Sequence, residues 1–455
     1  MKKSLLISGF LFLVYLGLIS YPSGQDRYTV EFRTPGMPAL DIKSANLLEE
    51  INQFQLQGIS PDENVVAGLY EVALLGELRF YKAEHEQFAV LENALGIKIP
   101  RDSETVISDG RRDVWTGNDM VLSNQDPLLR RYLQRHQQTL DQVAIIADRE
   151  HYANHYHSPG QTLVGALLPL AGSLRDYART LKIRSRVALA EDRVSDAITD
   201  VNAIYRLGHH LMSVGGTVVE VLVGKAVVDM TMTTWCEILS HPALTVDDLA
   251  RISSFVESAP RISGVKALDV FERLTAIQFV RHLEDYGAFG GELATNRGVR
   301  WTPLMDPALA FVDWPEIYKR INQDVNDDLD VLLDPNQQQR RTRIRAMHNQ
   351  QENGIQLPGD FNVLGGSAMA TDFAWKMIHE LFLDYSRYYL RVLEHARDQD
   401  EVLRVCIEVK QFHFDQQRYP DSLEELKDKY LDQIPLDYGT GEAFRYIQFK
   451  AGALV

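Results

Sequence analysis

Apolar side chains recur every three or four residues along most of this chain, the spacing that places them on one face of an α-helix. The spacing runs from residue 171 to 256 through segments joined by short polar turns, and residues 218–239 are apolar around most of the circumference. It returns over residues 265–283, 314–333 and 368–409, and a polar helix is expected at 336–349. Only residues 442–449 have the character of a β-strand. The pattern predicts a mainly α protein, an irregular helical array with a small C-terminal α+β module.

Residues typical of helix starts indicate where three of the expected helices begin. Ser60-Pro61-Asp62-Glu63 combines an N-cap serine, a proline at the first helical position and a glutamate at the third, so a helix is expected from there to about Leu75. Asp126-Pro127 begins a second helix in the same way, and Thr245 caps a third.

Two stretches, residues 100–123 and 286–313, show no helical period, and the second is rich in Gly, Pro and polar residues. We expect the second stretch to separate two helical regions. The predicted organisation is a signal anchor at 1–24, an N-terminal helical domain at 25–285, a linker at 286–313, a second helical region at 314–401 and a C-terminal module at 402–455.

The first residues have the composition of an export signal. Lys2 and Lys3 precede an apolar run over residues 4–21, and no charge follows until Asp26. The run is near the lower length limit for a membrane-spanning helix. We expect a single-pass anchor in the cytoplasmic membrane with the body on the extracytoplasmic, periplasmic side, because the lysines precede the span. Secretion after cleavage is the alternative, although no small residues are well placed for cleavage.

Charge and cysteine content narrow the class of protein. The chain has 63 acidic and 47 basic residues and a net charge of −16, which argues against a nucleic-acid partner, since such proteins display clustered basic residues. It contains two cysteines, Cys236 and Cys406, and the sequence leaves open whether they pair.

Three segments carry a family resemblance: residues 402–446, residues 176–200 with their polar turn, and residues 60–76. Together they resemble uncharacterised membrane-anchored protein families of planctomycete-type bacteria, which pair a helical body with a C-terminal module. This resemblance implies a fold and implies no activity.

Residues 402–455 also resemble the globular end of major pseudopilins of type II secretion, through Tyr419-Pro420, a following helix and the turn at Pro435 and Asp437. Val14 stands where prepilins have a glutamate, and the module lies far from the anchor. The pair of helices around Ala188 and Ala197 resembles a tetratricopeptide hairpin, in which small residues allow close packing, but no sustained repeat follows.

The sharpest candidate site is the segment Glu150-His-Tyr-Ala-Asn-His-Tyr-His157. His151 and His155 would share a face if this segment is helical, and neutral imidazoles at that spacing can bind zinc. The alternative is a polar helix end without metal.

Two other polar clusters are better explained by structure. The segment from Asp324 to Asp330 begins like a calcium loop but has Leu329 where the loop needs glycine, so an acidic helix face is expected. His209 and His210 lie on an apolar helix and are expected to be hydrogen-bonded or partly exposed rather than to bind metal.

These observations favour a membrane-anchored extracytoplasmic interaction or scaffold protein with a protein partner, because helical arrays present extended binding faces and no catalytic residues are nominated. An enzyme is less favoured. The alternatives are a metal-dependent envelope hydrolase that uses His151 and His155, and an accessory component of a secretion apparatus.

Overall fold

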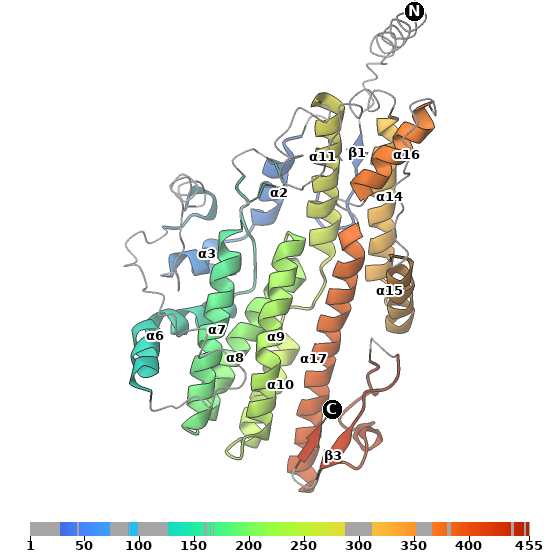
Figure 1. Cartoon of the computed structure of the whole chain (residues 1–455). Helices are drawn as coiled ribbons and strands as arrows, with labels where there is room; N and C mark the ends of the chain where they lie inside the picture. Colours follow the sequence, from blue (N-terminus) through green and yellow to red (C-terminus); the bar gives the residue numbers. More distant parts are fainter. Residues whose placement is uncertain are drawn as a thin grey trace, which may run out of the picture. The chain divides into compact units, whose positions relative to one another are not determined.

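The structure, a computed structural model, confirms a mainly α-helical chain, and the strands among its described residues form two short hairpins (Figure 1). The residues that it describes are 28–42, 45–72, 90, 92–98, 126–158, 162–163, 165–166, 168–286, 312–351, 366–379, 384–437, 441–449 and 452–454.

The chain forms two compact units, and each is assembled from three separate stretches. Unit 1 comprises Met1–Phe54, Ser158–Ala166 and Leu268–Tyr388, and unit 2 comprises Gln55–His157, Leu167–Ala267 and Tyr389–Val455. This division differs from the consecutive domains expected from the sequence. The expected boundary at residue 402 falls inside one continuous helix, α17 (Asp384–Gln416).

In unit 1, helix α14 packs against three neighbours. A short antiparallel hairpin pairs Thr29 with Asp41 and Val30 with Leu40. The elements are β1 (Thr29–Val30), β2 (Leu40–Asp41), most of α2 (Leu47–Leu56), α11 (Arg273–Tyr286), α14 (Trp314–Leu332), α15 (Gln337–Gln351) and α16 (Gly366–Ile378), with α14 contacting α11, α15 and α16.

A buried ion pair lies within unit 1, next to the π-helical turn η2 (Ala267–Glu272). Arg273 donates to Asp269 Oδ1 at 2.7 Å, while Asp269 Oδ2 accepts from the backbone N and Oγ1 of Thr34 at 2.6 and 2.8 Å. Asn322 and Asn326 of α14 accept from Arg273 as well. The segment from Asp324 to Asp330, which begins like a calcium loop, lies within α14 and is helical, as expected.

Unit 2 contains a layer of long helices, shown in green in Figure 1. Helix α8 contacts α6, α7, α9 and α10, so it is central to the layer. The elements are η1 (Pro61–Glu63), α3 (Val65–Glu71), α6 (Pro127–Ala147), α7 (Pro169–Ala190), α8 (Val194–Val214), α9 (Val218–Ser240), α10 (Val246–Ser258), α17 from Tyr389, η5 (Leu423–Leu426), β3 (Ile447–Phe449) and β4 (Gly452–Leu454).

Helices α7 and α8 form the hairpin expected from the sequence. Ala188 and Ala197 are buried, and the connecting turn places Asp192 at a positive φ of 55°. In that turn the backbone N of Arg193 donates to Ala188 O at 2.8 Å, which ends α7 with a left-handed cap.

The C-terminal module continues directly from α17. Val405, Val409 and Phe412 of the helix form an apolar cluster with Leu423 and Leu426 of η5. The strand expected at 442–449 is shorter than predicted, since β3 begins at residue 447 and pairs with β4.

The start of α3 differs from the prediction. Ser60 precedes only the short turn η1, and Asn64 is the residue whose side chain caps α3, accepting from the backbone N of Val66 at 3.0 Å. The helix begins late because Asn64 forms a parallel bridge with His151, in which Val65 N donates to His151 O at 2.8 Å.

Among the described helices, none is long and apolar enough to cross a membrane. The predicted anchor at residues 4–21 lies outside the described residues, as do residues 100–123 and most of the predicted linker.

Candidate functional site

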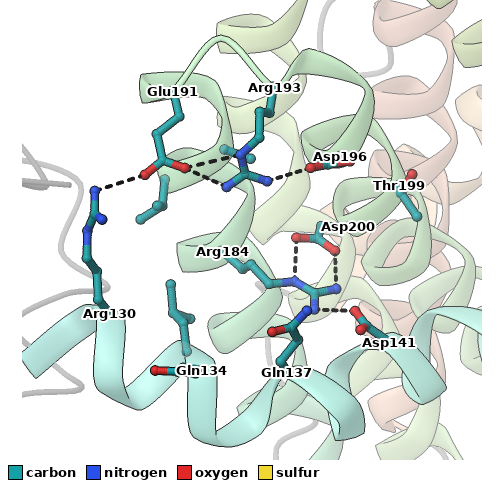
Figure 2. Close-up of a pocket in the computed structure, with 13 residues that line it drawn as sticks. Arg130, Gln134, Gln137, Asp141, Arg184, Glu191, Arg193, Asp196, Thr199 and Asp200 are labelled. Carbon is teal, nitrogen blue, oxygen red and sulfur yellow. Dashed lines mark hydrogen bonds and ion pairs between the residues drawn. The ribbon is translucent and has the colours of Figure 1, made fainter.

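A polar groove of about 650 Å³ lies between helix α6 and the α7–α8 hairpin (Figure 2). Its volume is within the usual range for ligand sites. Three of the lining residues are apolar: Leu133, Val187 and Ala188. The rest of the lining is polar or charged: Arg130, Gln134, Gln137, Asp141, Arg184, Glu191, Arg193, Asp196, Thr199 and Asp200.

Arg184 joins all three helices at the base of the groove. From α7 it donates through Nε and Nη2 to the two carboxylate oxygens of Asp200 on α8, at 2.9 and 2.6 Å. Its Nη1 donates to Asp141 on α6 at 2.6 Å. Asp200 is buried, whereas the side chain of Asp141 is 54% exposed. One guanidinium therefore fixes the spacing of the groove walls.

A second network occupies the rim. Glu191 accepts from Arg130 of α6 at 3.2 Å and from Arg193 at 2.7 and 3.1 Å, and Arg193 also contacts Asp196 (Figure 2). The side chains of Arg130 and Arg193 are 59% and 47% exposed. The rim is thus a set of solvent-accessible ion pairs, each of which contributes little to stability.

The charges of the groove compensate one another. Burial lowers the pKa of Arg184, but the hydrogen bonds and charges of Asp200 and Asp141 outweigh it and raise that pKa above its ordinary value. Glu191 and Asp196 similarly raise the pKa of Arg193. Both arginines are cations at all physiological pH values. Such an arrangement suits recognition of polar or charged groups and contains no activated nucleophile.

The segment around His151 and His155 is not helical. Helix α6 ends at Ala147, and residues 151–158 are not helical, with β-bridges at His151 and His157 and no regular element between them. The expectation that the two histidines share a helical face is therefore wrong, because the bridge between Asn64 and His151 holds the backbone in an extended conformation. Both histidines are half-buried.

The residues between the histidines form the interior contacts instead. Side chains of an extended segment alternate in direction, so Tyr152, Asn154 and Tyr156 share one face. All three are buried and donate to Glu220, with Tyr152 Oη and Asn154 Nδ2 at 2.9 Å from Oε1 and Tyr156 Oη at 2.6 Å from Oε2. The sequence pattern pointed to the histidines and not to Tyr152, Asn154 and Tyr156. The placement of these three residues at alternate positions was the signal that could have identified them.

Glu220 also completes the N-terminal cap of α9. Its Oε2 accepts from the backbone N of Thr217 at 3.0 Å, and its own backbone N donates to Thr217 Oγ1 at 3.0 Å, a capping box. Burial, followed by the negative charge of Glu220, raises the pKa of Tyr152 and Tyr156 well above the usual value. Burial lowers the pKa of nearby Lys266 to about 8, although Glu220 opposes the shift. Glu220 is the shared acceptor of a buried hydrogen-bond network that positions α9.

Zinc binding by His151 and His155 stays a prediction. Within the described part of the chain, no three His, Cys, Asp or Glu side chains are grouped so that they could hold a metal ion. The pair would need a further ligand from elsewhere.

His209 and His210 are both buried, and each makes at least one hydrogen bond. The ring nitrogens of His209 lie 2.8 Å from Pro260 O and 3.1 Å from Asp400 Oδ1. His210 Nε2 lies 3.3 Å from Ala147 O, and burial, followed by the charge of Arg206, lowers its pKa to about 4.

Comparison of the chain with protein-family models, curated proteins and solved structures finds no match in any of the three.

Proposed function

We propose that this chain is a membrane-anchored extracytoplasmic interaction protein, and that the groove between α6 and the α7–α8 hairpin binds an acidic segment of a partner protein. The observation that supports the proposal is the composition of the groove. Small-molecule sites are mostly apolar with a few polar groups, whereas only three of the lining residues here are apolar. A polypeptide can match many dispersed polar groups at once.

The choice of an acidic segment follows from the rim. Arg130 and Arg193 share the carboxylate of Glu191 and are substantially exposed. Guanidinium groups bind carboxylates through two parallel hydrogen bonds and are more weakly hydrated than the ammonium group of lysine. An incoming carboxylate can therefore replace Glu191 between the two arginines. Arg184 keeps its partners and preserves the groove.

A site-specific crosslink in cells tests this proposal. A photoreactive residue replaces Gln134, which lines the groove, and in a second strain replaces Gln142, an exposed glutamine of α6 that is outside the lining. We expect one reproducible adduct from position 134 and none from position 142. Equal adducts from both positions, or none from either, would contradict the groove as the binding site.

Charge variants identify the chemistry of the partner segment. Removing both rim cations, with Arg130→Gln and Arg193→Gln, should reduce the yield at position 134. Glu191→Gln should increase it, because the internal competitor is neutralised. A partner whose yield responds in the opposite direction at both sites would be basic and would refute the acidic segment.

The proposed anchor is tested in the same cells. The protein should be found in the membrane fraction of the spheroplasts, since residues 4–21 are proposed to span the membrane. Protease added to intact spheroplasts should digest the body, because the body is proposed to lie outside. A body that is protected from the protease would place it in the cytoplasm.

A further inference from the structure

Helices α9 and α17 of unit 2 run side by side in the same direction (Figure 1). Gln399 Nε2 of α17 donates to Asp229 Oδ1 of α9 at 2.7 Å. One turn further along both helices, Met232 and Val402 line the same cavity of about 480 Å³. The two pairs of residues, Asp229 with Gln399 and Met232 with Val402, follow each other in the same direction along both helices, so the helices are in parallel register.

This register repeats with the spacing of a heptad. Successive facing positions on α9 are Asp229, Met232 and Cys236, separated by three and four residues, and those on α17 have the same separations: Gln399, Val402 and Cys406. Seven residues make almost two helical turns, so positions seven apart return to the same face. Because Asp229 faces Gln399, Cys236 faces Cys406.

The surroundings of the two thiols agree with this placement. Burial raises the pKa of Cys406 to about 12, and the nearby sulfur of Cys236 acts in the same direction. Cys236 is exposed and Cys406 is half-buried, and both are free thiols in the structure. The chain contains no other cysteine.

We propose that Cys236 of α9 and Cys406 of α17 are the two halves of an intramolecular disulfide that forms when the protein meets a disulfide oxidant. The geometry is independent of the groove. An extracytoplasmic location, as in the proposed function, would supply the oxidising conditions.

The exposure of the two sulfurs sets the order of the reaction. The Cys236 thiol loses a proton and attacks one sulfur of a small disulfide, which forms a mixed disulfide and releases one thiol. The Cys406 thiol then loses its proton and attacks the Cys236 sulfur, which releases the second thiol. Two protein thiols are oxidised and one disulfide is reduced to two thiols.

The bond would attach the C-terminal module to the helical layer. Cys406 immediately follows Val405, whose side chain belongs to the apolar cluster of the module, together with Val409 and Phe412. The closed loop between the two cysteines is long, and long loops give the largest reduction of unfolded-state entropy in the chain-entropy model. Oxidation should therefore raise the melting temperature.

The test uses the full-length protein in detergent, first reduced and then incubated with oxidised glutathione. We expect both thiols to disappear, the mass to fall by two hydrogens, a non-reducing digest to contain one linked peptide with both cysteines, and the melting temperature to rise. Cys406→Ser should stop at the glutathione adduct of Cys236 and should gain no thermal stability. A wild-type protein that ends as a glutathione adduct or as a disulfide-linked dimer would overturn the proposal.

A second set of variants tests the register itself and does not depend on the native thiols. In a chain with both cysteines changed to serine, Met232→Cys with Val402→Cys should crosslink on oxidation. Met232→Cys with Arg404→Cys should not, because Arg404 is exposed on a different face of α17. Crosslinking of the second pair alone would refute the parallel register.

Discussion

Arg184 and Asp200 form a bidentate ion pair between α7 and α8, in which the aspartate side chain is only 4% exposed. Removing one partner of a buried pair leaves an uncompensated charge. Arg184→Met should lower the free energy of unfolding by about 3 kcal/mol or more. Arg130→Met, which removes an exposed groove arginine, should cost less than about 1 kcal/mol. Urea unfolding of both variants measures the difference, and equal losses would show that the pair is not buried as described.

The capping boxes of α9 and α10 should differ in strength. Glu220 accepts from buried tyrosine and asparagine donors as well as from Thr217, so Glu220→Ala leaves several buried donors unsatisfied. We expect a loss of about 3 kcal/mol or more. Asp248 caps α10 in the same way at an exposed site, and Asp248→Ala should cost about 1 kcal/mol. Thermal unfolding of the two variants compares them, and similar losses would mean that the donors around Glu220 find other partners.

Close packing of α8 and α9 should reverse the usual effect of a glycine substitution. A Cβ at Gly208 would lie 2.8 Å from Gly224 O and 2.6 Å from a Val228 methyl carbon, whereas a Cβ at Gly172 of α7 would meet nothing within 4 Å. Gly172→Ala should stabilise the protein by about 0.5–1 kcal/mol, because alanine favours the helix. Gly208→Ala should destabilise it by about 1–3 kcal/mol. Denaturant midpoints measure both, and a gain at Gly208 would contradict the close approach.

Buried His210 should make stability fall in mild acid. Its pKa is lowered to about 4 in the fold, whereas the unfolded chain titrates near the ordinary value of 6.5. The stabilising contribution is present above pH 6.5 and is lost as the pH falls to 4, because the unfolded state binds the proton more readily. The full difference is about 3 kcal/mol. His210→Gln should flatten the pH dependence of unfolding over this range, and the same change at the partly exposed His241 should leave it in place.

The extended backbone at His151 predicts the result of a metal analysis. Protein purified without chelator should have the same zinc content as the variant with His151→Ala and His155→Ala, because the side chains that converge in this segment are Tyr152, Asn154 and Tyr156. Elemental analysis of both samples is the measurement. About one zinc per chain, lost in the variant, would instead favour the envelope hydrolase.

Local signals in the sequence predicted much of unit 2. Asp126 caps α6 with its side chain, and Thr245 caps α10 as expected, because a cap depends on neighbours within a few residues. The apolar period located α7 to α10 for the same reason. The helix start at Ser60 was wrong because a partner nearly ninety residues away, His151, decided the local conformation.

The site itself was much less predictable. The groove brings together residues from three helices, and nothing near Arg184 in the sequence indicates that its partners are Asp141 and Asp200. The segment from His151 to His157 was predicted as a metal site because histidine is a common metal ligand. The side chains that make its buried contacts with Glu220 are instead Tyr152, Asn154 and Tyr156. The pairing of Cys236 with Cys406 likewise depends on the register of two helices that are distant in sequence.

The discontinuous composition of unit 2 has a consequence for synthesis. Tyr205 donates to Asp400, a partner 195 residues later in the chain, and His209 contacts the same carboxylate. At the usual rate of elongation, roughly 10–40 s separate the appearance of the two sides of this contact. The helical layer is therefore synthesised well before α17, the last helix of unit 2. Unit 2 can complete its fold only when translation has almost ended.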